Sequence, residues 1–342
     1  MLTDIFAIRY EQTPLIKVFG QRESRLLLQL FTILEEIEPY RDRENKIRDE
    51  AKAYWEIVHK RVSNELGVKW LSYPWYEVTV GLGEYRRTET RRRDEVYICQ
   101  NWMTAQPKEG ENVDEFVKER LSLFEVGMRE KYSEVEGYKA TMAADPQMER
   151  FYSNKLKSAE TRHTEGAEEV NARFKSSILP LHYHNGFIQL QRDDLISSEI
   201  EQPFWSSVSD PLWENVDTDM KEALDQRDSG GKDPAFYAGK ALESTIKIIS
   251  ELLNQTHGSE KGAHNFIDNI AKKSVKFLDE WEADALKHYF TKVRNPLGHG
   301  AGPERMPVLT FEQSSLAIEV AMSWIKLLVV RAREKKLVGS SQ

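Results

Sequence analysis

Hydrophobic residues at the spacing of a helix face dominate the first part of the chain. One such set comprises Leu26, Leu27, Leu30, Ile33 and Leu34. A second helix is expected from about Arg43 to Leu66, because Gly67 then follows as a stop signal. The pattern therefore predicts a helical N-terminal region.

The helical pattern is interrupted between residues 74 and 93. Pro74, Gly81 and Gly83 predict a strand or loop excursion. A basic cluster follows, made of Arg86, Arg87, Arg91, Arg92 and Arg93. Such a cluster either contacts RNA or forms an exposed, charged turn, and the exposed turn is the simpler interpretation.

Residues 112–178 return to helical periodicity in long, polar-rich stretches, with Phe124, Met128 and Tyr132 spaced four apart. We expect these stretches to form an antiparallel helical pair. The pattern then changes to two short apolar runs on either side of Asn185-Gly186, the dipeptide typical of a type I′ turn. Residues 179–190 are therefore predicted to form a β-hairpin.

Two acid–proline pairs, Asp210-Pro211 and Asp233-Pro234, each place a capping acid before a proline suited to the first position of a helix. Both should begin helices. Ser229, Gly230 and Gly231 lie between them and are the expected linker, so we place the last domain boundary there.

Four helices are predicted after Asp233. The first carries a stripe of Leu242, Ile246, Ile249 and Leu253, the second spans about residues 263–276, and the third extends from about Leu278 to Val293. The fourth begins with a capping box between Thr310 and Gln313. The segment thus predicts a four-helix bundle.

The fourth helix is apolar on most sides between residues 316 and 330. Its polar residues are mostly Glu319, Ser323 and Lys326. A helix of this kind should bury one face in the bundle and another against a partner subunit. The same three residues make it unsuited to cross a membrane.

The composition is that of a soluble globular protein, with 40% hydrophobic and 30% charged residues in 342 positions. This length suits two or three domains. The N-terminal residues have no signal-peptide pattern, and Cys99 is the single cysteine, so we expect a cytoplasmic protein. The net charge of −8 is uneven, because residues 232–342 hold 16 Lys/Arg and 13 Asp/Glu, a charge of +3, which leaves −11 upstream. The C-terminal part could therefore still face RNA.

The segment Arg294-Asn295-Pro296-Leu297-Gly298-His299 carries the candidate chemistry. On an unbroken helix Arg294 and His299 would lie about 140° apart, but Pro296 and Gly298 favour a kinked or terminated helix that could bring them together. Arginine binds phosphate in a planar, bidentate way, and histidine titrates near neutral pH. Together they would suit cleavage of an RNA phosphodiester without a metal, although an Arg at a helix end and a His in a glycine-rich cap are also common structural features.

This segment, together with Asp233-Pro234-Ala235-Phe236 and residues 241–247, resembles the HEPN domain of AbiJ-type abortive-infection proteins. The N-terminal part also resembles the domain that precedes it in that family, through Thr3-Asp4-Ile5-Phe6, Arg9-Tyr10-Glu11, Glu65-Leu66-Gly67 and residues 116–122. Residues 179–193 are similar to the hairpin between the two domains. The resemblance therefore covers nearly the whole chain.

The resemblance implies a metal-independent endoribonuclease that leaves 2′,3′-cyclic phosphate and 5′-hydroxyl ends. It implies a homodimer with the cleft between subunits, and a role in phage defence or toxin-like growth arrest. Arg294, Asn295 and His299 match the HEPN motif: His299 would act as general acid/base, Arg294 would bind phosphate and Asn295 would orient one of them. An acidic residue of the first HEPN helix often belongs to the cleft, which makes Glu243 a candidate, with Lys247 beside it. An exposed salt bridge between Glu243 and Lys247 explains that pair equally well.

The remaining candidate residues do not complete a site. His182 and His184 alternate along the predicted strand and should face one side, but no third metal ligand with suitable spacing follows. Cys99 lies in an apolar context and should be buried. We therefore expect no cofactor and no metal, and we expect all three residues to be dispensable for activity.

The sequence thus predicts a mainly α-helical protein. We expect an AbiJ-like helical domain with a small β excursion over residues 1–135, a helical and β-hairpin connector over 136–230, and a four-helix HEPN bundle over 231–336. The N-terminal region would sense a phage-derived or cellular trigger, and RNA would be the substrate. The alternative is a non-catalytic HEPN module that binds RNA, a nucleotide or a protein.

Overall fold

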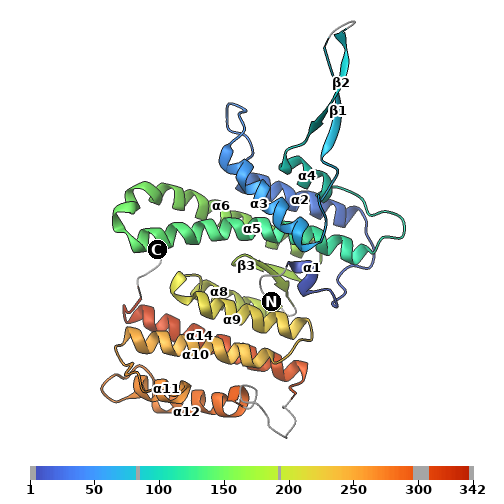
Figure 1. The fold of residues 1–342 in the computed structure, drawn as a ribbon. Coiled ribbons are helices and arrows are strands. Elements are labelled where there is room, and N and C mark those ends of the chain that lie inside the picture. The colour runs from blue at the N-terminus through green and yellow to red at the C-terminus, as the bar shows by residue number, and fades with distance from the viewer. Residues whose placement is uncertain (1–4, 82–84, 192–193, 296–307, 339–342) are drawn as a thin grey trace. The chain divides into compact units, whose positions relative to one another are not determined.

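The structure is a computed structural model that describes residues 5–81, 85–191, 194–295 and 308–338. These residues divide into two compact units, one within Thr3–Leu190 and one within Gln191–Gln342 (Figure 1). The described residues are mainly helical, with two small antiparallel hairpins, which confirms the predicted fold class.

The helices of the N-terminal unit are α1 (Phe6–Arg9), α2 (Gln21–Ile37), α3 (Asp49–Glu65), α4 (Glu95–Met103), α5 (Val113–Ala144) and α6 (Glu149–Ser176). Helix α3 ends as expected before Gly67 but begins later than the predicted Arg43. The physical reason is local: Asp42 Oδ1 accepts hydrogen bonds of 2.9 Å from the backbone N–H groups of Glu44 and Lys46. These bonds offer the backbone an alternative to the first helical turns.

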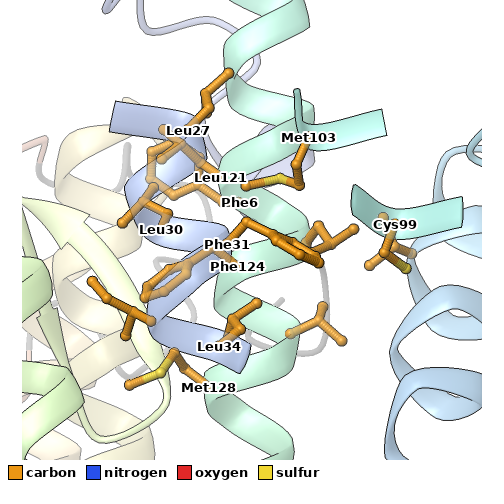
Figure 2. Close-up of a cluster of buried hydrophobic side chains, with 14 of the residues drawn as sticks. Phe6, Leu27, Leu30, Phe31, Leu34, Cys99, Met103, Leu121, Phe124 and Met128 are labelled. Carbon is orange, nitrogen blue, oxygen red and sulfur yellow. The ribbon is translucent and has the colours of Figure 1, made fainter. Parts of the chain in front are cut away.

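The core of this unit is a cluster of apolar side chains from α1 to α6 and the β3–β4 hairpin. Figure 2 shows part of it, where Phe6 of α1 meets side chains of α2, α4 and α5. All five apolar residues predicted for the face of α2 are buried there. Cys99 of α4 is also fully buried, and that burial raises the pKa of its thiol. The expectation that Cys99 behaves as a small hydrophobe is confirmed.

Helices α5 and α6 form the predicted pair and lie side by side (Figure 1). The expected domain boundary after residue 135 falls inside α5, which continues to Ala144. Because α6 packs on α2 as well as on α5, the whole pair belongs to the N-terminal unit.

The unit contains both hairpins. Strands β1 (Trp75–Val80) and β2 (Arg87–Arg92) form the first, and β3 (Leu181–His184) and β4 (Phe187–Leu190) form the second. In the second hairpin, Asn185 and Gly186 have φ angles of 41° and 88°. Positive φ at both positions is what a type I′ turn requires, so the predicted turn is confirmed.

Buried charges fasten the β3–β4 hairpin to α5. The fully buried carboxylate of Glu125 accepts hydrogen bonds from Arg9 (2.8 and 2.9 Å), from Arg129 (2.7 Å) and from the backbone N–H of Ile188 (2.8 Å). Arg9 also donates to the carbonyl of Ile188 at 2.8 Å. Burial alone would raise the pKa of Glu125, but the two guanidinium groups outweigh it and lower that pKa.

The C-terminal unit begins with three short pieces, α7 (Asp194–Ile196), the π-helical turn η3 (Ser197–Glu201) and α8 (Gln202–Ser207), and the 3₁₀ turn η4 (Pro211–Trp213). The longer elements are α9 (Glu214–Asp228), α10 (Pro234–Leu252), α11 (Ala263–Ala271), α12 (Glu280–Tyr289), the π-helical turn η5 (Phe290–Arg294) and α14 (Phe311–Glu334). The four helices expected after Asp233 correspond to α10, α11, α12 with η5, and α14.

The boundary between the two units lies at residues 190 and 191, and not at the expected residues 230 and 231. Helix α9 packs along α10, and Trp213 and Met220 share one hydrophobic core with Leu242. The glycines between α9 and α10 therefore form a turn inside the unit. The physical reason is that the apolar residues of α9, Met220 among them, are buried against α10 and α14.

The predicted helix starts are present, with one difference in capping. Asp210 accepts a hydrogen bond of 2.9 Å from the N–H of Leu212, and Thr310 and Gln313 form the expected capping box. Asp233 makes no such bond, because its backbone adopts a left-handed conformation with φ of 55°. Along the described residues, no helix combines the length and apolar character needed to cross a bilayer.

Candidate functional site

The candidate site is built on one face of α10. Leu242, Ile246 and Ile249 of this helix are fully buried in the bundle core. Phe236, Gly239, Glu243 and Lys247 lie off that buried stripe, spaced three or four apart, so they follow one another along a single face. The side chain of Arg294 lies against this face, at the end of the element that follows α12.

Arg294 ends the π-helical turn η5. The backbone N–H of Asn295 donates to the carbonyl of Phe290, five residues earlier, which marks the wider turn. The chain thus stays helical through Asn295, whose backbone angles are those of a right-handed helix. Residues 296–307 lie outside the described residues, and the predicted His299 is among them.

Gly239 provides the space for Arg294. A Cβ atom built on Gly239 would lie 2.8 Å from Arg294 Cβ and 2.5 Å from Arg294 Cγ. Carbon atoms that are not bonded to each other do not approach this closely. A glycine inside a helix costs about 1 kcal/mol relative to alanine. Here it lets η5 approach α10 closely.

Glu243 holds the guanidinium group. Arg294 Nη2 lies 3.0 Å from Glu243 Oε2, while Lys247 Nζ lies 2.8 Å from Glu243 Oε1. The sequence left open whether Glu243 forms a salt bridge with Lys247 or lies beside the motif residues. In the structure its carboxylate pairs with Lys247 and also with Arg294. The side chains of Glu243 and Arg294 are 13% and 20% exposed, so this pair is more shielded than an ordinary surface salt bridge.

Phe236 covers the other side of the arginine. The guanidinium carbon of Arg294 lies 5.3 Å from the centroid of the Phe236 ring, within the range of a cation–π contact. Among the described residues, Arg294 Nε is buried without a hydrogen-bond partner. The side chain is therefore positioned by Gly239, Glu243 and Phe236, and it keeps unused donor capacity.

The sequence did not single out Gly239 or Phe236 as site residues. A signal was present in the first case: Gly239 interrupts an otherwise strong helix one turn before Glu243, which points to close approach of another segment. Phe236 has no such signal, since an aromatic residue near the start of a helix usually belongs to the core.

The histidine pair lies in the other unit and shows no metal site. The rings of His182 and His184 are 6.0 Å apart, so they face the same side as predicted. His184 bonds to Gln189 at 2.6 Å, and burial lowers the pKa of His182 to about 4. Within the described ranges, no three His, Cys, Asp or Glu side chains are grouped to hold a metal ion.

Comparison with known proteins identifies the larger part of the chain. The family model described as AbiJ N-terminal domain 4 matches residues 4–206, which is more than half of the sequence and includes the whole α1–β4 unit as far as it is described. No match was found among curated proteins or among solved structures. The chain therefore belongs to the AbiJ N-terminal domain 4 family, in the setting of abortive infection and phage defence.

Proposed function

We propose that the C-terminal unit is a HEPN-type endoribonuclease that cleaves RNA without a metal ion, and that it acts in phage defence under the control of the AbiJ-type N-terminal unit. The observation that carries the proposal is the fixed position of Arg294, whose guanidinium group lies between Glu243 and Phe236. In the sequence, Arg294 directly precedes Asn295, and the motif histidine His299 follows five residues after Arg294. A preorganised arginine is what binding of a phosphodiester requires.

The proposed reaction begins with loss of the 2′-hydroxyl proton to a histidine. The 2′-oxygen then forms a bond to phosphorus while the bond from phosphorus to the 5′-oxygen breaks, and the departing 5′-oxygen takes up a proton. The products carry 2′,3′-cyclic phosphate and 5′-hydroxyl ends. Arg294 would stabilise the negative charge that develops on the phosphoryl oxygens, and Asn295 would orient the phosphate or the histidine.

Each chain offers one motif histidine, His299, yet the reaction needs one group to accept a proton and one to donate it. A two-fold homodimer would supply a second copy. An observation that favours dimerisation is the apolar outer side of α14, where Leu316, Leu327 and Val330 are 61%, 37% and 41% exposed. Trp281 of α12 is 65% exposed, and its ring centroid lies 6.4 Å from that of Trp324 of α14. A surface of this kind suits an isologous interface.

The proposal is tested by incubating the purified protein with total RNA in the presence of EDTA and analysing the ends of the fragments. His299→Ala and Arg294→Ala should each reduce cleavage by on the order of a hundredfold or more. Lys292→Ala is the matched control, because Lys292 is an exposed cation two residues from Arg294 in the same π-helical turn, and it should cleave normally. Circular dichroism would establish that each variant is folded.

Finding 5′-phosphate ends, or full activity in folded His299→Ala protein, would falsify the mechanism. The bundle would then be a non-catalytic module that binds RNA, a nucleotide or a protein. Light scattering that gives a monomer at micromolar concentration would remove the dimer from the proposal.

Gly239→Ala tests the seat of the arginine itself. The added methyl group must displace Arg294, so cleavage should fall by about tenfold or more while the bundle remains folded. Gly137→Ala is the control, since Gly137 also lies inside a helix but has open space around it. Equal activity of the two variants would show that the position of Arg294 does not matter for the reaction.

A further inference from the structure

The β1–β2 hairpin forms a two-stranded ribbon that projects from the rest of the N-terminal unit (Figure 1). Its register pairs Trp75 with Arg92 at the base and Val80 with Arg87 near the tip. All twelve strand residues are exposed or only partly buried, and none belongs to the core of the unit. A hairpin normally gains stability by burying one face, so both faces of this ribbon are open to a partner.

The ribbon is basic within an acidic protein. Residues 75–93 contain five arginines and three glutamates, a charge of +2 in a chain whose net charge is −8. Glu89 is shared between Arg87 and Arg91, at 2.7 and 3.0 Å, and the three side chains remain 75%, 51% and 30% exposed for Arg87, Arg91 and Glu89. In the part of the chain that the structure describes, Arg86 and Arg93 form no ion pair. The glutamates therefore leave a surplus of accessible guanidinium groups.

Aromatic rings alternate with these arginines. Trp75 and Tyr76 are 38% and 37% exposed, and Tyr85 at the tip is 87% exposed. Because cross-strand partners share a face, Trp75 lies beside Arg92 on one face and Tyr76 beside Arg91 on the other. The guanidinium carbon of Arg93 lies 4.9 Å from the centroid of the Tyr76 ring. The Tyr76 face thus offers a flat ring next to accessible arginines, whereas on the Trp75 face the cation, Arg92, is ion-paired with Glu95 at 2.5 Å.

We propose that this ribbon is a binding arm for single-stranded RNA. The arginines would contact phosphates, and Trp75, Tyr76 and Tyr85 would stack with bases, which are free to stack on side chains only where the strand is unpaired. An acidic peptide would satisfy the arginines but would leave the exposed rings without a stacking partner. The choice of RNA over DNA rests on the proposed function, whereas the charge and stacking arguments do not.

The test measures the affinity of the full chain for a short, fluorescent, single-stranded 2′-O-methyl RNA, which cannot be cut by 2′-hydroxyl attack. Substituting Arg86→Gln, Arg87→Gln and Arg91→Gln together should weaken binding by about tenfold or more. The slope of log affinity against log salt concentration should also become less steep by about 2, as expected for the loss of three phosphate contacts. The matched control is Arg150→Gln, Lys155→Gln and Lys157→Gln, which removes the same charge from exposed positions of α6 and should change affinity by less than about twofold. Trp75→Ala with Tyr76→Ala should weaken binding by about tenfold with little change in salt dependence.

A second variant removes the ribbon without touching the core. Residues 76–91 are replaced by Asn-Gly, so that Trp75 and Arg92, which are already paired, flank a two-residue turn. It should bind RNA at least as weakly as the arginine variant, because Tyr76 and Tyr85 are removed with the arginines. Equal losses in the α6 control, unchanged binding after truncation, tighter binding of single-stranded DNA or of duplexes, or displacement of the RNA by polyglutamate would each overturn the proposal. Ribbon-dependent binding without cleavage would refute only the ribonuclease proposal, and cleavage with ribbon-independent binding would refute only the arm.

Discussion

The two hairpins of the N-terminal unit have the same secondary structure and opposite surroundings. In β3–β4, six of the eight strand residues are buried, and Glu125 binds the backbone of Ile188. In β1–β2, no strand residue is buried. The difference teaches that the two hairpins have different roles. The β3–β4 hairpin is part of the folded core and is fixed by packing and buried charge, whereas the β1–β2 hairpin is exposed and available for binding. Four changes can test that distinction.

The largest effect is expected from Glu125→Ala. The substitution leaves Arg9 and Arg129 buried without their carboxylate and frees the backbone N–H of Ile188. Removing one partner of a buried ion pair costs about 3–5 kcal/mol of unfolding free energy. Glu130→Ala is the control on the same helix, because Glu130 pairs with Arg61 at 3.1 Å near the surface, and it should cost less than about 1 kcal/mol. Urea unfolding followed by circular dichroism would measure both, and similar losses would contradict the structural role of the buried charges.

Acidification should weaken the β3–β4 side of the unit next. Burial lowers the pKa of His163 and of His182 to about 4, and nearby Lys139 and Lys131 add to the shift for His163. Both rings are neutral in the folded state, while the unfolded chain takes up protons near pH 6.5. The contribution of the two neutral rings to the unfolding free energy is therefore fully present above pH 6.5. It is lost as the pH falls towards 4, by roughly 2–3 kcal/mol for each histidine.

Thermal unfolding between pH 4 and 7 measures this loss. His163→Gln should flatten the pH dependence, because it removes one of the buried rings whose pKa is lowered. An unchanged slope in His163→Gln protein would show that the ring does not titrate as inferred. The β1–β2 ribbon contains no histidine and should contribute nothing to the slope.

Two glycine substitutions sharpen the comparison at a smaller scale. Gly186 has φ of 88°, and an added Cβ would lie 3.3 Å from Arg129 Cγ, so Gly186→Ala should lower stability by about 1–2 kcal/mol. Gly81, at the ribbon tip, has φ of 89°, and its Cβ would lie 2.3 Å from the carbonyl oxygen of Tyr85. Gly81→Ala is thus the more strained locally, yet the melting temperature of the unit should not change, since the ribbon is not part of its core. A large drop for Gly81→Ala would mean that the ribbon supports the fold.

The smallest effect is expected from removing the ribbon. Replacement of residues 76–91 by Asn-Gly should change the unfolding free energy by less than about 0.5 kcal/mol, because none of the described residues of this segment is buried. Comparing this unfolding free energy with that of the Glu125→Ala variant thus separates a hairpin that stabilises the unit from one that does not. A loss above about 1 kcal/mol would place β1–β2 in the same class as β3–β4.

The sequence by itself determined the elements that depend on local chemistry. Helix periodicity predicted α2, α10 and α14, the Asn185-Gly186 dipeptide predicted the turn between β3 and β4, and Thr310 with Gln313 predicted a helix start. Each of these signals acts within a few residues, where spacing and backbone preference suffice. Arg294 was likewise recognisable as a candidate from its own motif.

The tertiary structure alone decided what depends on contacts between distant segments. Local sequence marks the two hairpins, by a basic cluster in one and apolar runs in the other, but the contact that fixes the second hairpin is tertiary, because Glu125 lies 63 residues from Ile188. The division of the chain was also tertiary, since α9 joins the C-terminal unit by packing on α10 across a glycine-rich turn. In the same way, Arg294 meets Glu243 and Gly239 only because η5 returns to α10. Side-chain packing and buried charge pairs are long-range in sequence, and for that physical reason local patterns did not reveal them.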